Sequence, residues 1–196
     1  TDGQSLNIVY SDATKGWLPL EDDVVAEAPE APNTQRAIFA YGDTGSVTNL
    51  SNLVTGVGTA RAGLAAATYG GDKAIFGYGS GYSNLSNLVT NVGVVGTDVT
   101  GVGTARDFLA ATSYGGDKAI FGYGNIYSGG YVIYSLKNLV SNSGVVASDV
   151  TGVGTARREL SATTYGGDKG MFAYGNSGGA TMVSLKNLVS NTGVVA

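Results

Sequence analysis

The side chains available for chemistry in this chain are carboxylates, guanidinium groups and tyrosines, because its 196 residues include neither histidine nor cysteine. Without these two residue types there is no Ser-His or Cys-His nucleophile, no histidine base near neutral pH, and no zinc or copper site built on histidine or thiolate ligands. We therefore expect no enzymatic activity, no cofactor and no bound metal. A catalytic alternative is a carboxylate-based glycan hydrolase or lyase, which needs two carboxylates roughly 5 to 9 Å apart in a groove.

Aspartate recurs at matching positions along the chain. Asp72, Asp117 and Asp168 each stand in a Gly-Gly-Asp-Lys sequence, and Asp98 and Asp149 each stand just before a Gly-Val-Gly connector. Recurrence at equivalent turn positions indicates a structural role in each copy. Calcium ligation and acid-base catalysis are the alternatives for these carboxylates.

Arginine recurs in the same way, as the last residue of each Gly-Val-Gly-Thr-Ala-Arg connector: Arg61, Arg106 and Arg157. We expect these arginines to form hydrogen bonds between repeats or within the connector, and a ring of anion-binding guanidinium groups is the alternative. The connector glycines at 101–103 and 152–154 lack the strand-to-helix context and the Lys-Ser/Thr pair of a phosphate-binding loop, which argues against nucleotide binding.

An insertion at residues 125–134 holds tyrosines that no other copy repeats. The neighbouring copy has only Ser80-Gly-Tyr-Ser-Asn84 at this point, and the length variation is confined to this one connection. Loops rich in Tyr, Ser, Gly and Asn suit the adaptable recognition of glycans or proteins. A loop of variable length with no partner is the alternative. The residues proposed for ligand contact are Asn125, Tyr127, Tyr131 and Tyr134.

The elements that must position these residues are copies of one repeat. Nearly the same eleven residues, Tyr-Gly-Gly-Asp-Lys-Ala-Ile-Phe-Gly-Tyr-Gly, begin at residues 69 and 114 and, slightly altered, at 165, so the spacing is 45 and then 51 residues. A partial copy starts at Arg36. Each full copy predicts a hairpin around its Gly-Gly-Asp-Lys turn, a third strand at Asn-Leu-Val, and a fourth strand around Gly-Val-Val and Asp-Val. The sequence therefore predicts an all-β fold of four-stranded antiparallel blades, as in a β-propeller.

The second strand of each copy predicts how neighbouring copies pack. In Ala-Ile-Phe-Gly-Tyr-Gly, the period-two alternation places Phe and Tyr on one face of the strand and the glycines on the other. Glycine weakens a strand unless another surface approaches it closely. We therefore expect the aromatic face of one sheet to pack against the glycine backbone of the next, through Phe76, Phe121 and Phe172.

The chain divides into a short first segment and a long repeat region. Residues 1–25 predict a β-hairpin formed by 5–10 and 17–20, which is too small to be stable in water without another surface. Residues 26–35 contain two prolines among alanines and acidic residues and predict a stiff, extended linker. The repeat domain covers residues 36–196, about 3.5 blades.

Composition excludes several classes of partner. Only 13% of the residues are charged and 32 are glycine, which favours turn-rich β-structure. The net charge of −4 and the lack of a basic cluster argue against nucleic acid and anionic membranes as partners. No apolar run approaches the roughly 18–20 residues of a membrane helix, so we expect no membrane insertion.

The repeat resembles the kelch-type propeller repeat. The resemblance lies in Arg157-x-x-Leu160-x-Ala162, then Gly166-Gly-Asp-Lys169, then a strand that ends in glycines. Here that strand ends in Gly-Tyr-Gly, where kelch repeats usually have two adjacent glycines. The resemblance implies a β-propeller fold.

The chain as a whole is similar to structural proteins of marine tailed bacteriophages. The similarity lies in the Gln-Ser-Leu-Asn-Ile-Val-Tyr and Gly-Trp segments, the Ala/Pro linker, and the tandem Lys-Ala-Ile-Phe-Gly-Tyr-Gly, Lys-Asn-Leu-Val-Ser-Asn and Thr-Gly-Val-Gly-Thr-Ala-Arg units. It implies a non-catalytic tail-fibre or adhesin-like protein on the virion surface, outside the cell, that binds a host receptor or glycan. A secreted carbohydrate-binding propeller lectin that is not part of a virion is the alternative.

The number of repeats raises the question of closure. About 3.5 blades fall short of the four to eight of single-chain propellers, and an unclosed array leaves exposed sheet edges. We therefore expect a homo-oligomer, a dimer or trimer whose chains close one ring or stack about a fibre axis, or contacts with other virion proteins. The alternative is that more repeats follow residue 196 in the natural protein.

Overall fold

The computed structural model describes residues 8–12, 14, 16–19, 40–43, 47–51, 58–81 and 83–196. The chain divides into two compact units, Thr1–Arg36 and Ala37–Ala196. In the described part of the first unit, β1 (Ile8–Asp12) and β2 (Gly16–Pro19) pair antiparallel, with a shift of register between Tyr10 and Asp12. The linker expected at residues 26–35 lies outside the described residues.

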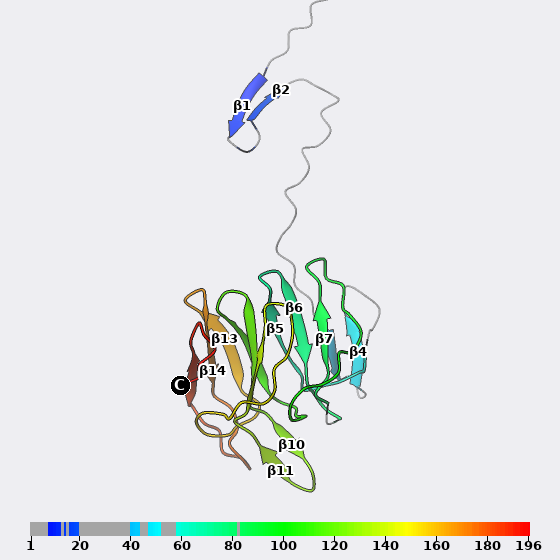
Figure 1. The fold of residues 1–196 in the computed structure, drawn as a ribbon, viewed down its shortest axis with the longest axis vertical. Helices are drawn as coiled ribbons and strands as arrows, with labels where there is room; N and C mark the ends of the chain where they lie inside the picture. Colours follow the sequence, from blue (N-terminus) through cyan, green and yellow to red (C-terminus); the bar gives the residue numbers. More distant parts are fainter. Residues whose placement is uncertain are drawn as a thin grey trace, which may run out of the picture. The chain divides into compact units, whose positions relative to one another are not determined.

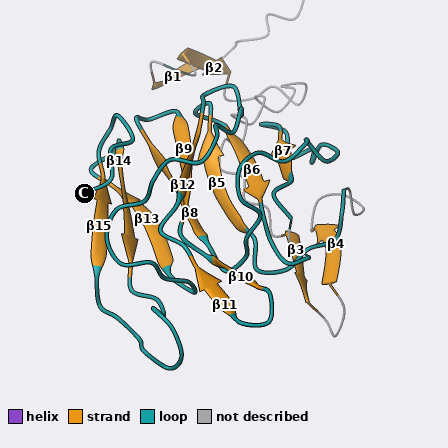
Figure 2. Ribbon diagram, turned by 60° about the horizontal axis from the view of Figure 1, so that its bottom comes forward, coloured by secondary structure: helices purple, strands orange, loops and turns teal. Residues whose placement is uncertain are grey.

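The second unit is a row of small antiparallel sheets (Figure 1). Every described element is a strand, a turn or a loop, which confirms the all-β prediction. Three sheets have three strands each, and they stand side by side in Figure 2. The two-stranded sheets of the second unit are β3 (Ala40–Asp43) with β4 (Val47–Ser51), and β10 (Asn125–Tyr127) with β11 (Tyr131–Ile133). The three-stranded sheets are β5 (Ala65–Tyr69), β6 (Lys73–Gly77) and β7 (Ser86–Val89); β8 (Ala110–Tyr114), β9 (Lys118–Gly122) and β12 (Lys137–Val140); and β13 (Ser161–Tyr165), β14 (Lys169–Ala173) and β15 (Lys186–Val189). Along the chain, β10 and β11 come between β9 and β12.

The fourth strand expected in each copy is present only as isolated bridges. In the first three-stranded sheet, Ser86 pairs with Val99 and Val89 with Val95, and no ladder joins the two bridges. The two bridges differ in register, because Ser86 and Val89 are three positions apart whereas Val95 and Val99 are four positions apart. The Asn87 side chain donates to the Gly96 carbonyl (3.1 Å) and helps to hold the segment at the edge. The structure therefore has three strands in each of these sheets, with the last segment of the repeat held along the edge.

Adjacent sheets are joined by phenylalanine packed on glycine, as the alternation predicted. A Cβ added to Gly77 would lie 2.6 Å from Cζ of Phe121, and one added to Gly122 would lie 2.8 Å from Cζ of Phe172. No real Cβ contact is that close, so only glycine leaves room for these rings. Both phenylalanines are fully buried. The predicted contact between aromatic ring and bare backbone is confirmed at these two junctions.

The predicted position of the repeated tyrosine is wrong. Strand β6 ends at Gly77, and Tyr78 has a φ of +65°, a left-handed conformation that is uncommon outside glycine. This turn moves the ring from the Phe76 face to the Gly77 face, where it meets Phe121 edge-on with 5.2 Å between ring centroids. Tyr123 repeats the arrangement with Phe172 at 5.3 Å. Period-two alternation therefore ends one residue before the tyrosine.

Candidate functional site

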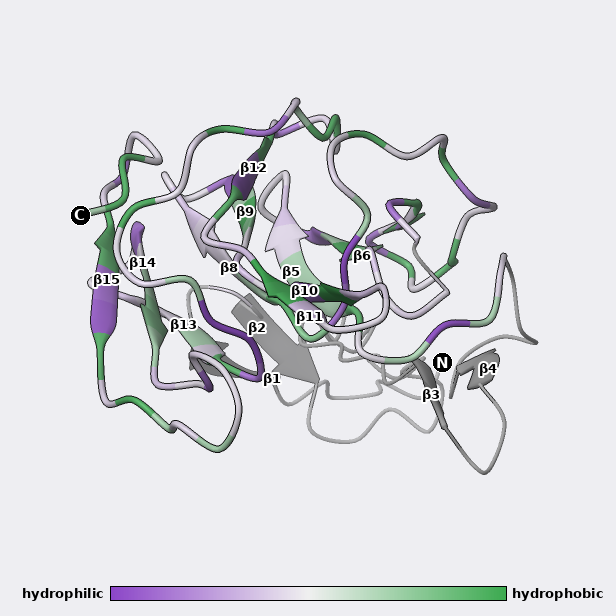
Figure 3. Cartoon of the chain, turned by 90° about the horizontal axis from the view of Figure 1, so that it is seen from below, coloured by the Kyte–Doolittle hydropathy of each residue, from purple (hydrophilic) through white to green (hydrophobic). Residues whose placement is uncertain are grey.

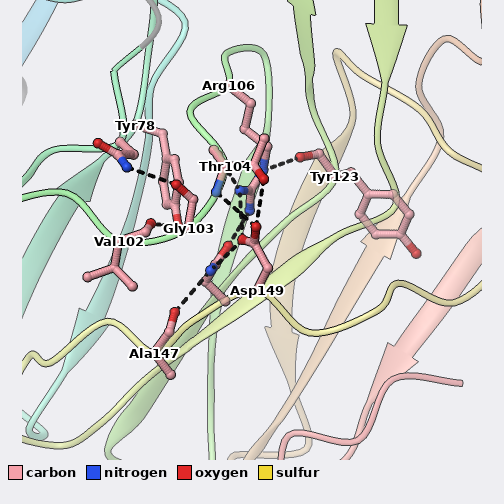
Figure 4. Close-up of polar contacts among 10 residues, drawn as sticks. Tyr78, Val102, Gly103, Thr104, Arg106, Tyr123, Ala147 and Asp149 are labelled. Carbon is pink, nitrogen blue, oxygen red and sulfur yellow. Dashed lines mark hydrogen bonds and ion pairs between the residues drawn. The ribbon is translucent and has the colours of Figure 1, made fainter.

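The repeated arginines lie in the core between sheets. Arg61, Arg106 and Arg157 are buried, and Arg106 shows their role most completely (Figure 4). Its three guanidinium nitrogens donate to the carbonyls of Tyr123 (2.7 Å) and Thr104 (3.0 Å) and to the Asn138 side chain (2.7 Å). The guanidinium also lies 4.3 Å from the centroid of the Tyr78 ring. Arg106 therefore joins the connector to the sheets on both of its sides.

The other two arginines repeat part of this pattern. Arg157 donates to Asn187 (2.8 Å) and lies 4.2 Å from the centroid of the Tyr123 ring. Arg61 donates to Asn87 and forms an ion pair with Asp98 (3.5 Å). Since each arginine binds groups of its own chain, the geometry favours hydrogen bonding between repeats over an anion-binding ring.

The aspartates before the connectors belong to the same hydrogen-bond network. Asp149 accepts from the Thr104 backbone (2.9 Å) and hydroxyl (2.6 Å) and from Asn138 (2.9 Å). Burial alone would raise the pKa of Asp149, but the bonds from Thr104 and Asn138 outweigh it and lower that pKa below its usual value. Asp98 is held in the same way by Thr59 and Asn87. These carboxylates are satisfied within the chain.

The hairpin turns that contain the turn aspartates, between β5 and β6, β8 and β9, and β13 and β14, lie at the end of the sheets away from β10 and β11 (Figure 1). Asp72, Asp117 and Asp168 each form an ion pair with the lysine that follows, at 2.7 to 2.9 Å. Those lysines hold the aspartate pKa values below normal. In the described part of the chain, no group of three or more His, Cys, Asp or Glu residues is placed to hold a metal ion.

The insertion at residues 125–134, expected as a loop, contains an antiparallel hairpin. Strands β10 and β11 pair from Asn125–Ile133 to Tyr127–Tyr131, and the hairpin comes toward the viewer in Figure 3. We call this element the tyrosine hairpin. Its Ser-Gly-Gly turn lies between β-branched and aromatic residues, a composition that favours pairing over disorder.

Two of the predicted contact residues form an exposed aromatic pair on the tyrosine hairpin. Tyr127 and Tyr131 are 55% and 54% exposed, and their ring centroids are 5.1 Å apart. The guanidinium of Arg158, which lies before the next sheet, stands 3.7 Å from the Tyr131 ring centroid. A cation over an aromatic face contributes about 0.5–1 kcal/mol at an exposed site. The arginine therefore holds one ring in place while leaving the pair accessible.

The other two predicted contact residues are not on that surface. Tyr134 follows the hairpin and is half-buried, and its backbone N–H donates to the Gly124 carbonyl (2.8 Å). Asn125 is 1% exposed, and its backbone pairs in both directions with that of Asp107 (2.8 and 2.9 Å). The sequence thus located the insertion but did not predict the direction of each of its side chains.

Asn125 lines a cavity behind the tyrosine hairpin, and both polar atoms of its side-chain amide are unsatisfied. Neither its Nδ2 nor its Oδ1 has a hydrogen-bond partner, and Oδ1 of Asp107 is also buried without one. The cavity has a volume of about 190 Å³, and we call it the Asn125 cavity. Its lining residues are Gly79, Gly81, Arg106, Asp107, Asn125, Ile126 and Tyr127. Unsatisfied buried polar groups are rare in folded proteins and need an explanation.

The equivalent residues of the neighbouring repeats are satisfied. Asn176, which pairs with Arg158 as Asn125 pairs with Asp107, donates to the Gly179 carbonyl (3.0 Å) and accepts from the Gly178 N–H (2.8 Å). Ser80 accepts from the Ala62 N–H (3.0 Å). The unsatisfied amide is therefore specific to one repeat.

Sequence reasoning missed Asp107 and Arg158. Both directly follow a repeated arginine, at a position occupied by Ala62 in the preceding copy. The sequence did contain a signal for them: this position holds a different residue type in every copy, whereas the arginine before it is always present. Burial raises the pKa of Asp107 above its usual value, partly offset by a hydrogen bond from its own backbone and by the charge of Arg158.

Comparisons with known proteins identify a similar fold but do not assign the chain to a family. No protein-family model matches the chain, and no curated protein matches it. A solved structure titled "Structure of YjhT" is similar with a TM-score of 0.56 and 13% sequence identity, over 70% of this chain and 44% of that chain. This chain thus corresponds to less than half the length of that protein. Within the described ranges, no helical segment has the length and apolarity needed to cross a membrane.

Proposed function

We propose that the chain is a non-catalytic recognition module of tail-fibre or adhesin type on the surface of a virion, which binds a host-surface glycan through the tyrosine hairpin. The observation that carries the proposal is the exposed pair of Tyr127 and Tyr131, held on a regular hairpin by Arg158. Aromatic side chains fixed before binding lose little conformational entropy when a ligand packs on them. The virion setting rests on the resemblance of the repeats to phage structural proteins.

The proposal includes a kelch-like β-propeller array for the repeats. The bridged last segment of each copy is the candidate fourth strand, for example where Val140 pairs with Val146 and Lys137 with Val150. The first strands β5, β8 and β13 contact one another in order, as inner strands of neighbouring blades do. The aspartates and arginines of the repeats bind one another or nearby backbone, which supports a structural role for them over catalysis.

A binding experiment on a glycan array tests the recognition role. We expect the wild-type chain to bind at least one surface glycan, and the double variant Tyr127→Ala/Tyr131→Ala to lose at least about tenfold in affinity, because exposed aromatic residues commonly dominate such contacts. Tyr165→Ala removes a tyrosine that is 38% exposed on a different sheet and serves as the matched control, which should bind like wild type. Absence of all glycan binding, or equal binding by the double variant, would contradict the recognition role.

The proposal also includes self-association through the outer face of β14. Tyr174 is 63% exposed, whereas its counterparts Tyr78 and Tyr123 are buried against a phenylalanine and an arginine of the following repeat. A cavity of about 130 Å³ lies beside it, lined mostly by apolar atoms of Ala162, Met171 and neighbouring residues. We propose that a second copy of the chain covers this face.

Light scattering, which measures the mass of the protein in solution, tests the proposed self-association. We expect a dimer or trimer of the 19.8 kDa chain, and a shift toward monomer in Tyr174→Lys, because a lysine would place a charge in a contact that is otherwise apolar. Tyr165→Lys is the control and should keep the wild-type mass. A wild-type monomer at every concentration measured would contradict self-association.

A further inference from the structure

We propose that the Asn125 cavity binds one neutral pyranose unit of the glycan, with Asp107 and Asn125 as its hydrogen-bonding residues. The inference rests on the proposed glycan recognition and extends it from the exposed tyrosines to a buried site with a defined chemistry.

The unsatisfied atoms of the cavity match a pair of sugar hydroxyls. The Asn125 amide offers two N–H donors and one acceptor, and Oδ1 of Asp107 is an acceptor, and none of these is used within the chain. The two backbones are directly opposite each other and bonded in both directions, so the two side chains are neighbours on one face. A hydroxyl both donates and accepts, and adjacent hydroxyls of a pyranose can donate to the carboxylate while accepting from the amide.

The charges around the cavity favour a neutral ligand. Asp107 repels phosphate, sulfate and carboxylate groups. Of the nearby cations, Arg106 lines the cavity and donates from all three nitrogens. Arg158 is not among the lining residues, pairs with Glu159 (3.4 Å) and lies over Tyr131. These two guanidinium groups in turn disfavour a cationic ligand.

The size of the cavity favours a sugar over a single water. One water needs about 10–15 Å³ of such volume, less than a tenth of the 190 Å³ found here. Gly79 and Gly81 form part of the lining, so backbone without side chains leaves room for a ring. Tyr127 also lines the cavity and is 55% exposed, which places an aromatic ring where the apolar face of a pyranose can pack.

Titration of the ¹⁵N-labelled chain with methyl pyranosides tests the inference directly. The probes are the methyl glycosides of glucose, galactose and mannose, with inorganic phosphate as the charged comparison. We expect at least one pyranoside, and not phosphate, to shift the Asn125 side-chain amide signals with saturation; Asn125→Ser identifies those signals by their loss.

Two variants separate binding from folding. Asp107→Asn keeps the shape of the side chain and removes its charge, and we expect at least a tenfold weaker affinity for the bound pyranoside with no loss of thermal stability. Asn176→Ser changes the satisfied equivalent of Asn125 and should leave the affinity unchanged.

The outcomes distinguish this inference from the proposed function. Hairpin-dependent binding on the glycan array without any pyranoside shift at Asn125 would overturn the pyranose site and leave the recognition role standing. A phosphate-induced shift, or wild-type affinity in Asp107→Asn, would also overturn it. If the chain binds no glycan on the array, the proposed function on which this inference rests is itself contradicted.

Discussion

Replacing Phe121 by alanine is expected to lower the free energy of unfolding of the repeat unit by about 3–5 kcal/mol, the usual cost of removing a fully buried phenylalanine. The ring is 0% exposed, packs on the Gly77 backbone and meets the edge of Tyr78 at 5.2 Å. Its loss opens a cavity at a junction between two sheets, where little else can move in. Urea denaturation followed by far-ultraviolet circular dichroism measures the change. Phe108→Ala is the matched control, because that ring is 43% exposed, and we expect it to cost less than about 1 kcal/mol.

A double-mutant cycle shows whether the ring and the glycine act as a pair. Gly77→Ala places a Cβ 2.6 Å from Phe121 and should cost about 1–3 kcal/mol through overpacking. In the Phe121→Ala background the same change meets an empty space and should cost much less. Strictly additive effects of the two substitutions would contradict the proposed contact.

Replacing Arg106 by methionine is expected to cost about 3–5 kcal/mol of stability, because the change strands several buried acceptors at once. The guanidinium is buried and donates to Tyr123, Thr104 and Asn138. It also covers the Tyr78 ring, whose burial raises the pKa of that phenol to about 12. Equilibrium denaturation measures the loss, with Lys186→Met on the exposed side of β15 as the control for removing a positive charge.

The lysine variant shows which property of Arg106 matters. Lysine keeps the charge but cannot donate in three fixed directions or stack its plane on an aromatic ring, so Arg106→Lys should recover less than half of the lost stability. Wild-type stability in Arg106→Lys would mean that charge alone is sufficient. A cost below about 1 kcal/mol for Arg106→Met would contradict the connecting role of this side chain.

The repeat itself supplied most of the fold prediction. Turn chemistry at Gly-Gly-Asp-Lys and period-two alternation placed the β5–β6 and β8–β9 hairpins, and the glycine opposite Phe121 predicted the contact between sheets. The predicted fourth strand reduced to single bridges because the register shifts by one residue between them, which period-two alternation does not reveal. Tyr78 was misplaced because alternation gives no warning of a positive φ at a tyrosine.

The candidate site was harder to predict than the fold. The tyrosine hairpin could have been recognised from its Gly-Gly turn and flanking β-branched residues, and its position as the variable insertion was visible in the sequence. The Asn125 cavity could not have been recognised from the sequence, because Asp107 and Asn125 come from separate parts of the repeat and meet only through a backbone bridge. Whether an asparagine is satisfied depends on neighbours such as Gly178 and Gly179, which only the structure provides.

Repeated and unrepeated residues have different roles in this chain. The repeated arginines, aspartates and phenylalanines hold sheets together, whereas Asp107, Tyr127 and Arg158 occur in one copy each and lie with Asn125 around the tyrosine hairpin. Rigid scaffolds with variation concentrated in a few connections are a common arrangement for binding proteins. This division supports the assignment of recognition to one end of the sheets.

Chemical-shift mapping of the ¹⁵N-labelled chain with the glycan that binds best on the array tests this assignment most directly. The recognition account predicts shifts concentrated at Asp107, Asn125, Tyr127 and Tyr131. Shifts confined to the Gly-Gly-Asp-Lys turns at the opposite end of the sheets would contradict it.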